Sequence, residues 1–263
     1  ILRVPITFPP EKFNGLLLSA MCVPDLRGTQ GTFTCYSTAP APAGETIGGL
    51  RRLLRPDGPG AWRGEIIGPD APGGRGRRGS DDDGADAAAL RLPLRVSVDA
   101  AARRADFSVD GQRFALGPDQ DSGWVRLAFS AGPGSRVRGL ARFRVLSWAE
   151  PFSFYMTPLH VDPESPAVPI SHPPHFAMAL AKLHGPYATL GLAEDTWALN
   201  ERVSDEQAFL DQAYAIHEER RRQFLHALDR TPEGVVSVVF DATDRIQHMF
   251  FRYLDPEHPA NRG

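Results

Sequence analysis

The chain has 263 residues, 42% of them hydrophobic and 23% charged, a balance that suits one large globular domain or two small ones. Its formal net charge of -3 argues against a nucleic-acid-binding protein, whose signature is a strongly basic face. No apolar run approaches the roughly 18 residues of a membrane-spanning helix. Cys22 and Cys35 are too few for a disulfide framework, so we expect two buried thiols.

Extended segments separated by turns are predicted for residues 1–36. Residues 1–4 indicate a strand that stops at Pro5, and the apolar run 15–21 is compatible with a buried strand. Residues 69–88 contain no aromatic or branched apolar side chain, so burial cannot offset the entropy of ordering them. We therefore predict a mobile surface loop at 69–88.

Short strands are predicted over residues 90–147. Apolar and polar residues alternate there, and the dipeptide Asp110-Gly111 is typical of a two-residue hairpin turn. This spacing of strands and turns indicates an antiparallel sheet or sandwich, inserted into another fold.

A helix followed by a strand and a second helix is predicted from residue 204 onward. Ser204 and Gln207 have the spacing of a capping box. Apolar residues then recur on one helical face, and the helix should end before Thr231. They are Phe209, Ala213, Ile216, Phe224 and Leu228. The β-branched run 235–240 indicates a buried parallel strand, and a helix should cover 242–254.

Two potential metal ligands follow this predicted strand directly. Asp244 and His248 are four residues apart, so on a helix both side chains share one face, one turn from each other. A carboxylate and an imidazole so placed suit a divalent cation such as zinc. The alternative is an aspartate near the helix start and an ordinary surface histidine.

The run Thr243-Asp-Arg-Ile-Gln-His248 resembles the Asp-x-x-x-His metal-ligand motif of the alkaline phosphatase superfamily. Within it, the type I phosphodiesterase/nucleotide pyrophosphatases and the phosphonoacetate hydrolases are most similar. Residues 2–10, 13–15 and 191–200 also resemble predicted phosphohydrolase or phosphomutase members. The resemblance covers the two ends of the chain well and the β-rich middle weakly.

The resemblance implies an α/β/α core with parallel strands, supplied by residues 1–36 and 151–263 and interrupted by a β-rich insertion at 37–150. It implies a metal-dependent hydrolase of phosphate esters, phosphodiesters or phosphonates that acts on a phosphorylated small molecule. Asp244 and His248 would bind one of two metal ions, zinc first and manganese second. The nucleophilic Ser or Thr and the later ligands of that family lie outside these residues, so the chain alone should be inactive.

Two charged residues beside the predicted metal ligands are expected to play supporting roles. Only one aspartate of this run binds metal in the family, so Asp241 is assigned to supporting a ligand or to a helix cap. Arg245 lies beside Asp244 and could bind a phosphate oxygen, although a solvated arginine is the ordinary alternative.

Four further polar residues lie in loop-like runs and could line a pocket, with turn and cap roles as the more ordinary alternative. They are Asp25, Arg27, Asp195 and Asn200. The two histidines of 171–175 flank prolines and indicate a structural turn. Residues 74–79 match GxGxxG by letter but lack the strand and helix of a dinucleotide site. Residues 81–84 lack the glutamate that closes a calcium loop.

Two rival functions remain open. The β-rich insertion could make the protein a non-catalytic binding module for a glycan or a protein, or the enzyme could be a transferase or mutase of the same superfamily. The sequence determines neither the substrate nor the oligomeric state, and it favours the cytoplasm only slightly.

Overall fold

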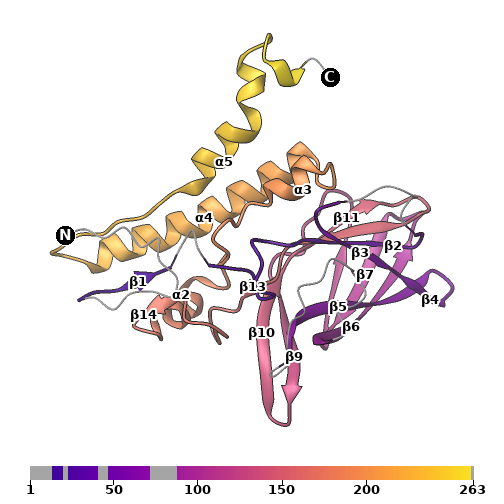
Figure 1. The fold of residues 1–263 in the computed structure, drawn as a ribbon, viewed down its shortest axis with the longest axis horizontal. Coiled ribbons are helices and arrows are strands. Elements are labelled where there is room, and N and C mark those ends of the chain that lie inside the picture. The colour runs from indigo at the N-terminus through magenta and orange to yellow at the C-terminus, as the bar shows by residue number, and fades with distance from the viewer. Residues whose placement is uncertain (1–13, 20–22, 41–46, 72–87, 262–263) are drawn as a thin grey trace.

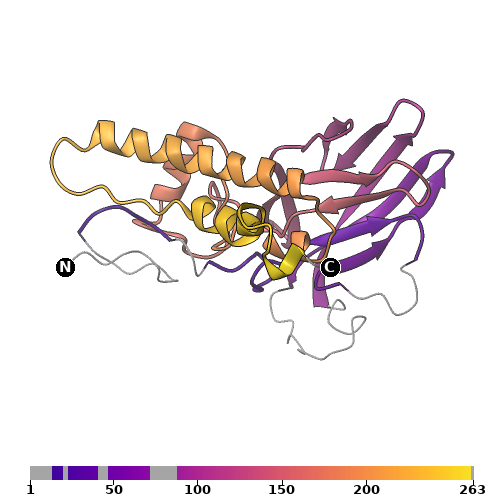
Figure 2. The same cartoon turned by 90° about the horizontal axis from the view of Figure 1, so that it is seen from above.

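The structure is a computed structural model that describes residues 14–19, 23–40, 47–71 and 88–261. It contains both helices and strands, with most of the strands gathered on one side and the helices on the other, beside one short pair of strands (Figures 1 and 2). In the described part of the chain, no helix is long and apolar enough to cross a membrane.

A five-stranded antiparallel sheet forms the outer layer of the β-rich half, in the order β4-β5-β6-β7-β8. Its strands are β4 (Arg55–Gly58), β5 (Ala61–Asp70), β6 (Ala89–Asp99), β7 (Arg104–Val109) and β8 (Gln112–Leu116). The predicted hairpin turn joins β7 to β8, where Asp110 and Gly111 both have positive φ, 48° and 73°. Such backbone angles match the right-handed twist of the paired strands.

Two smaller sheets pack near this layer. One has the order β11-β12-β2-β3, with β2 at Thr34–Ser37, β3 at Leu50–Leu53, β11 at Phe143–Ser147 and β12 at Ser153–Met156. The other has the order β13-β10-β9, with β9 at Val125–Gly132, β10 at Ser135–Ala141 and β13 at His160–Val161. The parallel pair β2–β3 is the one departure from antiparallel pairing among the described strands. The β-rich unit therefore includes β2, β12 and β13 as well as the strands of 37–150.

An aromatic core joins the layers. The rings of Phe107 and Phe154 meet edge to face with centroids 5.1 Å apart, and Tyr36 stacks on Phe154 at 4.6 Å. All three side chains are at most 1% exposed. Since each large aromatic ring buries much apolar area, this cluster stabilises the contact between the five-stranded and four-stranded sheets.

The helical half begins with a two-stranded pair, β1 (Leu17–Leu18) with β14 (Ser171–His172). It continues with α2 (Phe176–His184), α3 (Thr196–Asn200), α4 (Glu206–Arg230) and α5 (Asp241–Phe250). Two short 3-10 helices follow, η2 (Phe251–Leu254) and η3 (Pro259–Asn261). Helix α4 ends before Thr231, as predicted, and buries Phe209, Ala213 and Ile216.

Several local predictions need correction. Asp205, not Ser204, caps α4, because its Oδ1 accepts the Ala208 N–H at 2.7 Å. Leu228, predicted for the apolar face of this helix, is 44% exposed. Residues 69–71, predicted as part of the loop 69–88, instead continue the pairing of β5 with β6, where the Ala71 N–H donates to the Ala88 oxygen at 2.8 Å. Residues 72–87 lie outside the described ranges.

The predicted buried strand at 235–240 is wrong. The segment is extended but forms no ladder with any described strand, and Val235 is 70% exposed. Alternate side chains are half-buried, and Phe240 packs against Phe224 and His217 of α4. A β-branched run favours an extended backbone, whereas a strand also requires a neighbour that offers its own backbone groups.

Candidate functional site

Helix α5 carries the predicted ligands and lies antiparallel to α4, fixed to it at both ends. Near its start, the Arg220 Nη1 donates to Asp241 Oδ2 at 2.6 Å, and both side chains are largely buried. Near its end, the Phe250 ring lies 5.9 Å from the Phe209 ring. An ion pair and a ring contact therefore set which face of α5 points outward.

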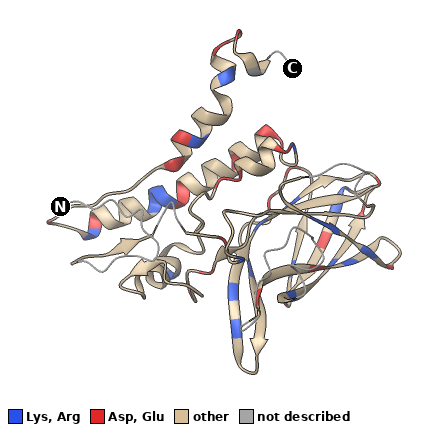
Figure 3. Cartoon of the chain, viewed as in Figure 1, with Lys and Arg blue, Asp and Glu red and all other residues tan. Residues whose placement is uncertain are grey.

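Asp244 and His248 lie on that outward face, one turn apart as predicted. The His248 Nε2 is 3.3 Å from Asp244 Oδ1, and the two side chains are 72% and 59% exposed. The Arg245 Nη1 is 3.4 Å from the other carboxylate oxygen of Asp244. Acidic side chains in the first turn of a helix, visible in Figure 3, are also favoured by the helix dipole.

This arrangement presents two ligand atoms of suitable type to one point in space. A divalent cation held between Oδ1 and Nε2 would be bound by both residues. Among the residues that the structure describes, no group of three or more His, Cys, Asp and Glu side chains is arranged to hold a metal ion. Without metal, an exposed i,i+4 pair of this kind stabilises a helix by about 0.2–0.5 kcal/mol.

Arg245 is not the solvated side chain of the ordinary alternative. It is only 19% exposed, and its Nε is buried with no hydrogen-bond partner. The guanidinium therefore lies against the protein beside Asp244.

A buried charge cluster lies beneath α5. Glu194 is 1% exposed, and both of its carboxylate oxygens are buried without a hydrogen-bond partner. Burial raises the pKa of Glu194, while the nearby charge of Arg220 lowers it and that of Asp241 raises it. A carboxylate in such surroundings costs less free energy when it is protonated. The cluster thus links the 191–195 loop to the start of α5.

The sequence had not marked Glu194 as functional, although it lies within the stretch 191–200 that carried part of the resemblance. A second residue without such a signal is Glu219 of α4. It accepts the Trp124 indole N–H at 2.7 Å and the Ala188 N–H at 2.8 Å. Burial raises the pKa of Glu219. Its contacts tie α4 to the start of β9.

Two of the four loop residues, both aspartates, organise the backbone. Asp25 accepts the N–H groups of Arg27, Thr29 and Thr32 at 2.8–3.0 Å. Asp195 caps α3 by accepting the Ala198 N–H at 2.9 Å, and it also accepts the Tyr155 hydroxyl at 2.5 Å. These contacts are turn and cap roles.

Asn200 lines a large pocket between the four-stranded sheet and the α3–α4 corner. The turn at 171–175 is structural, because the Ser171 hydroxyl donates to the Pro173 oxygen and accepts the Ala177 N–H. Cys35 is half-buried, and burial raises the pKa of its thiol to about 12. Cys22 and the segments 74–79 and 81–84 lie outside the described residues.

Comparison of the chain with protein-family models, with curated proteins and with solved structures gave no match. The function therefore has to be argued from the residues and their geometry.

Proposed function

We propose that this chain is part of a metal-dependent hydrolase of phosphate esters, phosphodiesters or phosphonates, in which Asp244 and His248 bind one catalytic metal ion. The observation that carries the proposal is the 3.3 Å separation of Asp244 Oδ1 and His248 Nε2 on the exposed face of α5. The resemblance of residues 243–248 to the alkaline phosphatase motif supports the same pair. Zinc is the expected metal, with manganese as substitute.

The surroundings of the pair support a phosphoryl-transfer role. The Arg245 Nη1 is 3.4 Å from Asp244 Oδ2, which places the guanidinium where it could contact a phosphate bound to the same metal ion. A metal ion would neutralise the charge that develops on phosphorus oxygens during attack. The resemblance implies that a Ser or Thr nucleophile and further ligands complete the site, because two ligands leave a zinc ion open to water.

The α/β/α parallel-sheet core of the alkaline phosphatase superfamily belongs to this proposal as well. In the described structure, α4 and α5 are joined by the extended segment 235–240. The support for the core is therefore the order of these elements and the resemblance, since 235–240 forms no ladder among the described strands.

The test is a titration of the chain with zinc, in which calorimetry measures the binding. Elemental analysis after dialysis then measures the zinc that the protein retains. We expect weak zinc binding, with a Kd above about 1 μM because only two ligands are present. The substitutions Asp244→Asn and His248→Ala should each reduce the affinity by at least about tenfold, since each removes one of the two ligands.

Two controls separate this site from other zinc-binding groups. His175→Ala removes an exposed histidine that is distant in sequence from Asp244 and His248, and it should leave the zinc affinity unchanged. His226→Ala tests a rival pair, because the rings of His184 and His226 are 4.9 Å apart. Zinc binding that survives Asp244→Asn and His248→Ala but disappears in His226→Ala would contradict the proposal.

A further inference from the structure

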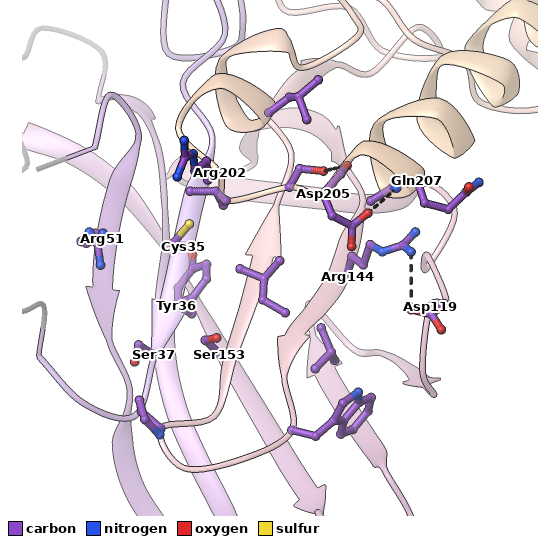
Figure 4. A pocket seen from close by; sticks show the side chains of 18 of the residues that line it. Cys35, Tyr36, Ser37, Arg51, Asp119, Arg144, Ser153, Arg202, Asp205 and Gln207 are labelled. Carbon is purple, nitrogen blue, oxygen red and sulfur yellow. Dashed lines mark hydrogen bonds and ion pairs between the residues drawn. The ribbon is translucent and has the colours of Figure 1, made fainter. Parts of the chain in front are cut away.

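A wide pocket opens between the four-stranded sheet and the corner that joins α3 to α4 (Figure 4). Its cavity volume is about 1550 Å³, more than most small-molecule sites of roughly 300–1,000 Å³. The sheet forms its floor, and residues 199–208 form the opposite wall. The pocket is independent of the proposed metal pair, neither member of which lines it.

Strand register places an arginine at each edge of the floor. Arg144 lies opposite Tyr155, Tyr155 opposite Cys35, and Cys35 opposite Arg51, so these four side chains share one face of the sheet. In Figure 4, Arg51 and Arg144 lie on either side of Cys35. The Tyr155 hydroxyl donates to Asp195, which leaves the arginines as the charged groups of this row.

Two hydroxyl groups form the next row of the same face. Ser37 lies directly opposite Ser153, two residues along each strand from Cys35 and Tyr155. The two serine side chains are short, so the floor is low beside the row that carries the two arginines. Such a polar strip differs from the opposite face of the sheet, where Tyr36 and Phe154 enter the aromatic core.

The charge of the pocket is predominantly positive. Six arginines and three carboxylates line it: Arg51, Arg52, Arg103, Arg144, Arg202 and Arg252, with Asp119, Asp205 and Glu206. Two of the three carboxylates are engaged within the protein. Asp205 caps α4, Glu206 pairs with Arg252, and Asp119 lies 3.9 Å from Arg144. Asp211, which lies outside the lining, also contacts Arg144 at 3.3 Å.

Arg202 projects into the pocket from the α3–α4 corner. It has a φ of 57°, is exposed and lines the pocket opposite the sheet. A left-handed backbone is uncommon for a side chain of this size, and here it directs the corner toward the sheet. The guanidinium of Arg51 is near enough to Cys35 to lower the pKa of that thiol against the larger effect of burial.

We propose that this pocket binds a small polyanion that carries two or more phosphate or sulfate groups, held between Arg51 and Arg202 above the hydroxyls of Ser37 and Ser153. Arginine guanidinium groups and hydroxyls are the donors that such anions prefer. Arg51 lies on the sheet that forms the floor and Arg202 lies on the opposite wall, so an anion held by both in a pocket of this width needs more than one charged group. A single phosphate would contact only one of these two arginines.

The test is calorimetric titration of the chain with tripolyphosphate and with inorganic phosphate at low ionic strength. We expect tripolyphosphate to bind at least about tenfold more tightly than phosphate. Arg51→Gln combined with Arg202→Gln should weaken tripolyphosphate binding by at least about tenfold. If the double variant does not fold, Arg202→Gln alone should weaken binding by about fivefold, because this side chain is exposed.

The matched control is Arg136→Gln combined with Arg138→Gln on β10, two exposed arginines outside the pocket. It removes the same net charge and should change the affinity by less than about twofold. Equal weakening by both double variants would overturn the proposal, as would no detectable binding by the parent chain. Titration with inositol hexakisphosphate and with sucrose octasulfate then distinguishes phosphate from sulfate groups. Tighter binding of either compound supports the site and identifies the anionic group that it prefers.

Discussion

The buried histidine of β13 predicts that the protein loses stability at acid pH. His160 is 1% exposed, and its Nδ1 accepts the N–H groups of Thr189 and Leu190, each at 3.1 Å. Its ring meets the Trp124 ring edge to face at 4.7 Å. An imidazole that accepts two hydrogen bonds at one nitrogen must be unprotonated there, so protonation would break this contact between β13 and the 188–190 segment.

The magnitude follows from the shift in pKa. Burial, reinforced by the charges of Arg142 and Arg220, lowers the pKa of His160 from 6.5 to about 3. Because the folded-state pKa lies below the unfolded value, the unfolded chain binds the proton more readily, and stability is lost as pH falls from about 6.5 toward 3. Between pH 7 and pH 5 the loss from this one group is about 2 kcal/mol.

The assay is urea unfolding of the parent chain and of His160→Gln between pH 7 and pH 5. At pH 7 the variant should be less stable by about 1–3 kcal/mol, because it loses the ring contact and one well-placed acceptor. That gap should shrink by about 2 kcal/mol at pH 5, since glutamine does not titrate. His175→Gln, which changes an exposed histidine, should leave the pH dependence unaltered. A constant gap across this range would refute the reasoning.

Three further predictions concern stability. Glu194→Gln should become more stable relative to the parent in urea unfolding as the pH rises above 4.5, because burial raises the pKa of Glu194 and its ionisation then costs stability; a pH-independent difference would contradict this. Gly68→Ala should lower stability by about 1–3 kcal/mol, since its Cβ would lie 2.5 Å from the buried Phe129 ring, whereas Gly117→Ala would meet only the flexible Gln120. Replacing residues 72–87 with a four-residue Gly-Ser turn should change stability by less than about 1 kcal/mol, because Ala71 and Ala88 are already hydrogen-bonded; a loss above about 2 kcal/mol would show otherwise.

Much of the candidate site was predictable, because it depends on helical spacing. Asp244 and His248 are one turn apart on α5, as the four-residue interval predicts, and the metal role of the pair stays a prediction. The burial of Arg245 and Glu194 was not predictable. Their surroundings depend on how α5 lies on α4 and on the 191–195 loop, which are contacts between distant parts of the chain.

The pocket in front of the four-stranded sheet was also beyond sequence reasoning. Arg51 and Arg144 are 93 positions apart, and only the pairing of β11, β12, β2 and β3 brings them to one face. Asn200 was a candidate pocket residue, but its partners were not identifiable. Strand register across four strands depends on which faces are buried, which no single strand specifies.

The sequence by itself determined the features that depend on neighbours within about four residues. These are the Asp110-Gly111 hairpin, the end of α4 at Arg230 and the helix that begins at Asp241. Tertiary structure decided that 235–240 forms no ladder among the described strands, that Asp205 caps α4, and that Glu194 is buried without a partner. The physical reason is that turn and helix preferences act through local sterics and hydrogen bonds. Strand pairing and the burial of charge instead depend on groups that folding brings together from far along the chain.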